Sequence, residues 1–305
     1  MDQKQQSALK TTDLSGAMVA LVTPMNSEGD INWDQYQHLI DWHISLKTPA
    51  VIIAGTTGES ALLTTEETER LWSIATQRCA NTDTLVIAGT GAISPRQVMT
   101  NNQQAAACGA HVALVVTPYY LRLTQQALLD HFTAIADNSP IPVLLYNVPS
   151  RTGNDLETKT TQQLAKHDNI IGIKEAKADM GRISQLAKID SFAVLSGDDG
   201  SFCDAMQLGA AGVISVAANV RPKALQQICH AITLGDVSHA NELDQSLQGL
   251  YDLLSQEPNP GPIKAVMNAA KMLSSGIRRP LQLMSLNQTQ LKQHIGAIKQ
   301  EFTNQ

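Results

Sequence analysis

The sequence predicts an α/β fold, a (β/α)8 TIM barrel with a C-terminal all-helical extension, and two observations indicate it. Eight short apolar runs rich in Val and Ile recur between residues 17 and 219 of the 305-residue chain. None alternates polar with apolar residues, which is typical of strands buried on both faces. Segments with helical periodicity separate the runs at intervals of about 20–35 residues, which favours a barrel of equal units over a doubly wound sheet.

The eight apolar runs are the expected strands, and turn signals follow each of them. In order they are AMVALVTP from Ala17, AVIIAGTTG from Ala50, LVIAGTG from Leu85, HVALVVTP from His111, PVLLYNVP from Pro142, IIGIKEA from Ile170, FAVLSGDD from Phe192 and GVISVAAN from Gly212.

Helix signals lie between these strands. Thr64 or Thr65 can cap a helix whose first turn is acidic. Ser94 is an expected N-cap, with Pro95 as the first helical residue and Gly109 as the stop. Further helices are expected to begin near Thr124, Asp155, Asp179, Ser201 and Arg221.

The pattern changes near residue 234, after which only helices are expected, over about 237–254, 262–273 and 287–302. The proline-rich stretch QEPNPGPIK separates the first two of them. We therefore expect two domains, a catalytic barrel over residues 12–235 and a C-terminal helical domain over residues 236–305.

Composition argues against several classes of function. The net charge of −6 and the absence of a basic run give no footprint for nucleic acid. The N-terminus lacks an apolar signal region, and no window approaches the roughly 18 apolar residues of a membrane span. The four cysteines are scattered, as expected for reduced thiols in a cytoplasmic protein. The dispersed histidines, with His38 and His43 five apart, predict no metal site.

Chemistry in such a barrel sits where the strands end, so the residues at those ends are the candidates. Lys174 follows an apolar strand, where a lysine taken alone is more often a solvated strand end than a nucleophile. Thr56 and Thr57 could equally cap the next helix, and Asp198 and Asp199 are expected to cap a helix rather than act as acids. The strand ends together supply Thr56, Thr57, Tyr119, Tyr120, Tyr146, Arg151 and Lys174.

This combination of residue types favours Lys174 as a nucleophile. A primary amine forms a Schiff base with a carbonyl carbon when it is uncharged, and burial favours the uncharged form. Tyrosine and threonine hydroxyls both donate and accept hydrogen bonds, so Tyr146, Tyr120 and Thr56 can relay protons. The guanidinium of Arg151 matches the geometry of a carboxylate.

The chain resembles the dihydrodipicolinate synthase / N-acetylneuraminate lyase family of pyruvate-dependent class I aldolases. The resemblance runs nearly end to end, from GAMVALVTPM to EPNPGPIK and into the last helices. The motifs GTTGES, TPYY, YNVPSRTG, GIKEA and LSGDD occur in order at the separations found in the family.

The resemblance implies a catalytic role for each matching residue. Lys174 forms the imine with pyruvate, so no separate cofactor is expected. Tyr146 is the general acid and base, in a proton relay with Thr56 and with Tyr120, which in this family reaches in from a neighbouring subunit. Thr57 contacts the pyruvyl carboxylate.

The family also suggests a second substrate and an assembly. Arg151 holds the carboxylate of the incoming aldehyde, while Gly197 and Ile214 contribute backbone around the site. The arginine and the second tyrosine of TPYY favour L-aspartate-4-semialdehyde as that aldehyde, on the route to diaminopimelate and lysine. A lyase for N-acetylneuraminate or a 2-keto-3-deoxy sugar acid, and a non-catalytic barrel, are the alternatives. The family assembly is a homotetramer built from two tight dimers.

We predict weak or absent feedback inhibition by lysine. Relatives that lysine inhibits bind it at the dimer interface, where Ser60, Ala61 and Tyr119 match, but four positions depart from that pattern: Thr65, Thr68, Ile93 and Gln97. Gln97 stands where a glutamate would meet the ligand's ammonium group, which removes a charge-assisted hydrogen bond of about 1.5–3 kcal/mol. A steady-state assay with added lysine checks this, and half-inhibition at sub-millimolar lysine would refute it.

Overall fold

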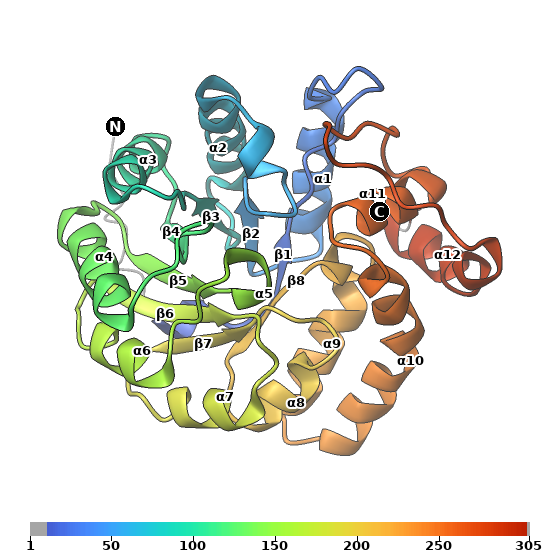
Figure 1. Cartoon of the computed structure of the whole chain (residues 1–305). Helices are drawn as coiled ribbons and strands as arrows, with labels where there is room; N and C mark the ends of the chain where they lie inside the picture. The colour runs from blue at the N-terminus through green and yellow to red at the C-terminus, as the bar shows by residue number, and fades with distance from the viewer. Residues whose placement is uncertain (1–10, 304–305) are drawn as a thin grey trace.

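The described residues, 11–303 of a computed structural model, place eight parallel strands in a closed barrel inside a ring of helices (Figure 1). The strands follow one another in chain order, and β8 closes the barrel by pairing with β1. The predicted fold class is confirmed. The strands are β1 (Gly16–Ala20), β2 (Ala50–Ile53), β3 (Leu85–Gly89), β4 (Val112–Val116), β5 (Val143–Asn147), β6 (Ile170–Glu175), β7 (Ala193–Ser196) and β8 (Gly212–Ser215).

Helices alternate with these strands and then continue alone. The helices around the barrel are α1 (Trp33–Ser45), α2 (Thr65–Cys79), α3 (Pro95–Ala107), α4 (Gln125–Asn138), α5 (Pro149–Thr152), α6 (Thr158–Leu164), α7 (Met180–Leu186), α8 (Phe202–Gln207) and α9 (Pro222–Thr233). The later helices are α10 (Val237–Ser255), α11 (Gly261–Ala269) and α12 (Gln288–Thr303). Single turns of 3-10 helix are η1 (Thr11–Asp13), η2 (Ser60–Leu62) and η3 (Ala217–Asn219).

Local signals account for most helix ends. Thr64 and Glu67 form a reciprocal capping box at the start of α2, with hydrogen bonds of 3.2 and 2.9 Å. Ser94 precedes α3 but makes no capping hydrogen bond with its side chain, while Gly109 takes a φ of 89° just after the helix. The helix expected over 262–273 ends earlier, at Ala269, because Lys271 takes a left-handed φ of 64°.

Two hydrophobic cores hold the fold together. One fills the barrel interior and includes Met18, Ile52, Leu144, Tyr146 and Ile214. The other lies between the outside of the strands and the helices. This division follows from the strands, whose side chains point alternately to the two faces.

The later helices lie together on one flank of the barrel, where α10 packs along α9 (Figure 1). The proposed division into domains at residue 235 stays a prediction, although strand and helix do cease to alternate after α9. Across the described part of the chain, none of the helices has the length and apolar character needed to cross a membrane.

Candidate active site

Lys174 faces the barrel interior because β6 contains an irregularity. The register between β5 and β6 skips Ile171, as in a β-bulge. Ile171 belongs to the interior core, whereas Ile170 and Ile173 belong to the outer one. Regular alternation beyond Ile171 would turn Ile173 inward and Lys174 outward. The extra residue reverses this, so the lysine that ends an apolar strand points inward.

The register of the two strands also places Lys174 beside Tyr146. The Nζ atom of Lys174 lies 4.4 Å from the centroid of the Tyr146 ring, and each residue is 7% exposed. Gly197, at the end of β7, leaves room for the lysine stem, since a Cβ atom there would stand 2.8 Å from Cε of Lys174. The amine is thus buried and close to a phenol ring.

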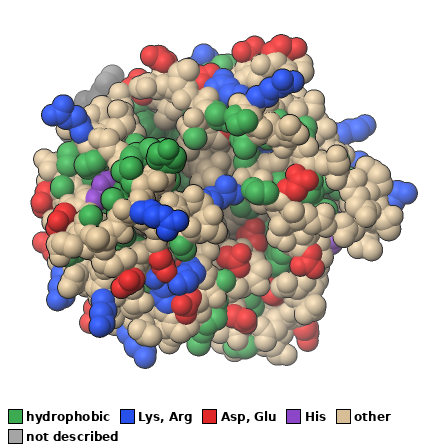
Figure 2. All heavy atoms as spheres, viewed as in Figure 1, with side chains coloured by type: hydrophobic (Ala, Val, Ile, Leu, Met, Phe, Trp, Pro, Cys, Tyr) green, Lys and Arg blue, Asp and Glu red, His purple; other side chains and the backbone are tan. Residues whose placement is uncertain are grey.

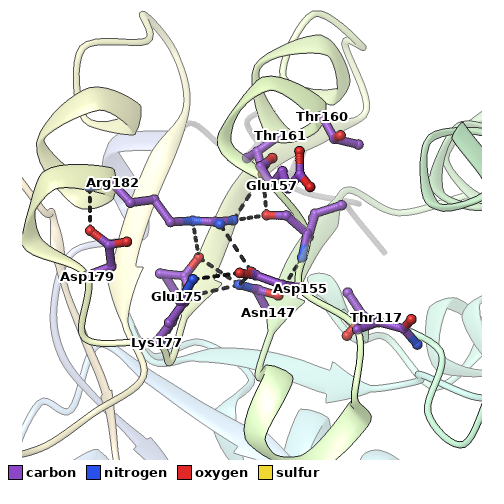
Figure 3. Close-up of polar contacts among 12 residues, drawn as sticks. Thr117, Asn147, Asp155, Glu157, Thr160, Thr161, Glu175, Lys177, Asp179 and Arg182 are labelled. Carbon is purple, nitrogen blue, oxygen red and sulfur yellow. Dashed lines mark hydrogen bonds and ion pairs between the residues drawn. The ribbon is translucent and has the colours of Figure 1, made fainter. Parts of the chain in front are cut away.

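A polar network fixes the ends of these two strands from outside the barrel (Figure 3). Asn147 and Glu175 directly follow Tyr146 and Lys174 and are also paired in register. The Nδ2 group of Asn147 donates to both oxygens of Glu175, at 3.0 and 3.1 Å, and to Asp155 at 2.9 Å. Because adjacent strand residues point to opposite faces, these outward contacts hold the backbone that carries the two inward groups.

Arg182 on α7 neutralises this network. Its Nε lies 2.6 Å from Oε2 of the fully buried Glu175, and its Nη1 donates to Asp155 at 3.2 Å. Burial raises the pKa of the Glu175 carboxyl, an effect that Arg182 and Asn147 oppose. Burial also acts to raise the pKa of Asp155, but hydrogen bonds from Lys177 and Asn147 and the nearby cations lower it overall. The carboxylates are therefore held by cations on α7 and the β6–α7 loop.

The predicted residues gather around a cavity of about 370 Å³ at the barrel mouth. Six of them line it: Thr56, Thr57, Tyr146, Arg151, Lys174 and Gly197. The face drawn in Figure 2 is hollowed near its middle, with charged side chains of both signs around the hollow. In the described residues, 11–303, no group of three or more His, Cys, Asp or Glu side chains is placed to hold a metal ion.

A second cavity, of about 540 Å³, adjoins the first. Thr56, Val148, Arg151 and Asn259 line both cavities, so the two meet at these residues. Arg151 stands at this junction, exposed, and its Nη2 donates to the carbonyl oxygen of Asn259 at 3.0 Å. The larger cavity also contains the positions from which lysine insensitivity was predicted, except Ile93: Thr65, Thr68 and Gln97.

Two predicted residues lie outside the Lys174 cavity. Ile214 is 1% exposed and its side chain packs in the barrel interior below the mouth. Tyr120 is 91% exposed and takes a left-handed φ of 73°. Neither is among the residues that line the cavity. Within one chain the structure therefore brings together six of the eight predicted residues.

One face of α10 supplies cavity residues that sequence reasoning missed. Gln248, Tyr251, Asp252 and Ser255 all line the Lys174 cavity. Their spacing of i, i+3, i+4 and i+7 puts them on one side of the helix. Gln248, Tyr251 and Asp252 fall within the predicted helix 237–254, and their spacing was the available signal.

The two aspartates after β7 have different hydrogen-bond partners. Oδ2 of Asp199 accepts hydrogen bonds from the backbone N–H groups of Val216 and Ala217, at 3.2 and 2.8 Å, and so caps η3 rather than α8. Asp198 accepts a hydrogen bond from Ser201 at 2.5 Å. Burial raises the pKa of Asp199. Asp199 thus caps a helical turn, as expected for one of the two aspartates, whereas the side chain of Asp198 bonds to a hydroxyl group and caps no helix through this contact.

We predict that the Glu175–Arg182 ion pair is strongly coupled. The Arg182→Met variant leaves a carboxylate buried without its cation and is expected to lose about 3–5 kcal/mol of unfolding free energy. The double variant Glu175→Gln/Arg182→Met lacks the lone charge and is expected to recover most of that loss. Urea unfolding of the single and double variants measures the coupling. Additive losses in the double variant would contradict a coupled pair.

The comparisons with known proteins agree with this geometry. Residues 13–300 match the model of the dihydrodipicolinate synthetase family. The chain is 42% identical over 276 residues to the 4-hydroxy-tetrahydrodipicolinate synthase of Buchnera aphidicola subsp. Schizaphis graminum, covering 90% of this chain and 94% of that protein.

Solved structures give the same result. The chloride inhibited dihydrodipicolinate synthase from Acinetobacter baumannii, complexed with pyruvate, superposes with a TM-score of 0.88 at 36% identity, covering 95% of this chain and 99% of that one. DHDPS from Cyanidioschyzon merolae, with lysine bound, has a TM-score of 0.88 at 30% identity, covering 95% and 98%. The family predicted from the motifs is confirmed: the chain belongs to the dihydrodipicolinate synthetase family.

Proposed function

We propose that the protein is a 4-hydroxy-tetrahydrodipicolinate synthase, a lyase that condenses pyruvate with L-aspartate-4-semialdehyde. One observation carries the proposal. The buried amine of Lys174 lies 4.4 Å from the ring of Tyr146 at the mouth of a barrel, in a chain that relatives of this activity match over about 90% of its length. A buried lysine at a barrel mouth suits Schiff-base chemistry.

Lys174 begins the reaction as the nucleophile. Its uncharged amine attacks the keto carbon of pyruvate, and loss of water from the adduct leaves an imine. The cavity around Nζ is lined by Thr56, Thr57 and Tyr146, whose hydroxyls can donate to the departing oxygen and to the pyruvyl carboxylate. The protonated imine then makes the pyruvate methyl group acidic, because the enamine spreads the electron pair onto nitrogen.

Tyr146 moves the protons of the next steps. Its hydroxyl passes on a proton from the methyl group, and the enamine carbon attacks the aldehyde carbon of the second substrate. Arg151, at the junction of the two cavities, offers its guanidinium to the carboxylate of that substrate. The aldehyde oxygen takes up a proton and becomes a hydroxyl group. The amine of the substrate then attacks the imine carbon and closes the ring. A proton moves from the substrate nitrogen to the Lys174 nitrogen, the bond between that nitrogen and the ring carbon breaks, and a cyclic imine and the free lysine amine result.

The surface position of Tyr120 supports an assembly in which the site is shared. Its two neighbours in the chain, Tyr119 and Leu121, are large apolar residues that are also exposed, at 38% and 44%. Such a patch on a surface is typical of a protein interface. We propose that a second copy covers this patch and receives Tyr120 into its proton relay, within a homotetramer of two tight dimers.

We predict product formation from pyruvate and L-aspartate-4-semialdehyde, followed by absorbance or by a coupled reductase. Tyr146→Phe is expected to lower kcat by about 10²–10⁴-fold, the usual contribution of a general acid and base. Lys174→Ala is expected to lose at least as much, because no imine can form. Lys166→Ala, a change of an exposed lysine after α6, serves as the matched control and should keep full activity.

The competing activity is tested in the same preparation. Cleavage of N-acetylneuraminate or of a 2-keto-3-deoxy sugar acid, without condensation of the semialdehyde, would replace the proposed substrate by a sugar acid. Folded protein active in neither assay would overturn the proposed function.

A further inference from the structure

The turn that carries Thr56 and Thr57 is held by residues far away in the chain. Glu59 ends this turn in a left-handed conformation, with φ 63° and ψ 31°. Such a conformation is unfavourable for a residue other than glycine and persists where the surroundings impose it. The side chain of Glu59 points away from solvent and is fully buried. The contacts of this side chain are therefore what can hold the backbone in the left-handed conformation.

Lys264 on α11 is the main contact of Glu59. The two side chains form an ion pair in which both are fully buried. The Nζ group of Lys264 also donates to the carbonyl oxygen of Thr23 at 2.9 Å, and the hydroxyl of Thr23 donates to the carbonyl oxygen of Gly58 at 2.7 Å. The ammonium group therefore ties the end of β1 to the turn after β2.

Arg278, in the segment that follows α11, is the second contact of Glu59 from the C-terminal extension. Its backbone N–H donates to the second carboxylate oxygen of Glu59 at 2.9 Å. Its guanidinium donates to Glu67 at 2.5 and 2.6 Å and to the carbonyl oxygen of Leu62 at 2.7 Å. Both oxygens of Glu59 are thus bound by the C-terminal extension.

A buried ion pair is weak evidence for a gain in stability, because removing two charges from water costs about as much as their attraction returns. Burial lowers the pKa of Lys264, and Glu59 opposes that shift. The hydrogen bonds of the ion pair are directional, so they fix the orientation of the Glu59 side chain. Apolar side chains of the same size would pack without fixing an orientation. The group it fixes is the turn whose Thr56 and Thr57 line the Lys174 cavity, whereas Lys264 itself lines neither cavity.

We propose that Lys264 is a positioning residue of the reaction, which acts through Glu59 to hold the hydroxyls of Thr56 and Thr57 toward Lys174. The inference rests on the proposed function, because it assigns the two threonines to proton relay and carboxylate binding. The helical extension is then part of the catalytic apparatus and not only a cover for one flank of the barrel.

The test compares two variants of the full chain with wild type. Lys264→Met leaves Glu59 unpaired, whereas the double variant Glu59→Gln/Lys264→Met removes both charges at similar volume. The double variant is expected to melt near the wild-type temperature, yet to show kcat lowered by about 10–100-fold and a raised KM for pyruvate, as displacement by about 1 Å produces. Borohydride trapping of pyruvate on Lys174 at saturation is expected to persist in both variants, because β5 and β6 are unchanged.

Arg221→Met is the matched control. Arg221 pairs with Glu301 of α12 at 2.8 Å, so its loss loosens the extension without touching the turn. It is expected to lower the melting temperature and to leave kcat and KM unchanged.

Three outcomes separate the possibilities. Wild-type kcat and KM in the double variant would overturn the positioning role and leave the proposed function intact. Equal kinetic losses in Arg221→Met would also overturn it, by showing that any loosening of the extension suffices. A wild-type protein that forms neither adduct nor product would overturn the proposed function, and the positioning role with it.

Discussion

The buried carboxylate of Glu175 is the interaction on which the arrangement of the barrel mouth depends. It sits one residue after Lys174, and its pairing with Asn147 and Arg182 fixes the ends of β5 and β6 together (Figure 3). The irregularity at Ile171 decides which face of β6 each residue takes. With the irregularity, the polar network lies outside the barrel and the amine inside. Without it, the carboxylate of Glu175 would enter the cavity and the amine of Lys174 would leave it.

The site is assembled from three separately held pieces. The strand pair β5–β6 carries the amine and the phenol, and the network around Arg182 holds it. The turn after β2 carries Thr56 and Thr57, and the buried contact between Glu59 and Lys264 holds it. Arg151 lies in α5 and donates a hydrogen bond to the carbonyl oxygen of Asn259 in the extension. The first two pieces thus use contacts outside the Lys174 cavity to fix groups inside it, as preorganised catalysis requires, whereas Arg151 is held by Asn259, which itself lines the cavity.

The sequence predicted the features that are local in the chain. Unbroken apolar runs identified the strands, and the polar residues at or just beyond their carboxyl ends identified Lys174, Tyr146 and the threonine pair. It did not predict contacts that depend on pairing or packing. The register shift at Ile171 exists only against β5. Glu59 and Lys264 are 205 positions apart. The apolar residues after Ala269 predicted that the helix continues to residue 273, but it ends because Lys271 takes a left-handed φ. The roles of the site residues and the assembly stay predictions.

The measurement that tests the central claim most directly is borohydride reduction of the protein in the presence of pyruvate, followed by intact mass and peptide mapping. The account predicts one reduced pyruvyl adduct per chain, on Lys174, because among the described residues it is the lysine that lines the cavity at the barrel mouth, beside Tyr146. Folded protein that acquires no adduct, or one that carries it on another lysine, would contradict the Schiff-base mechanism.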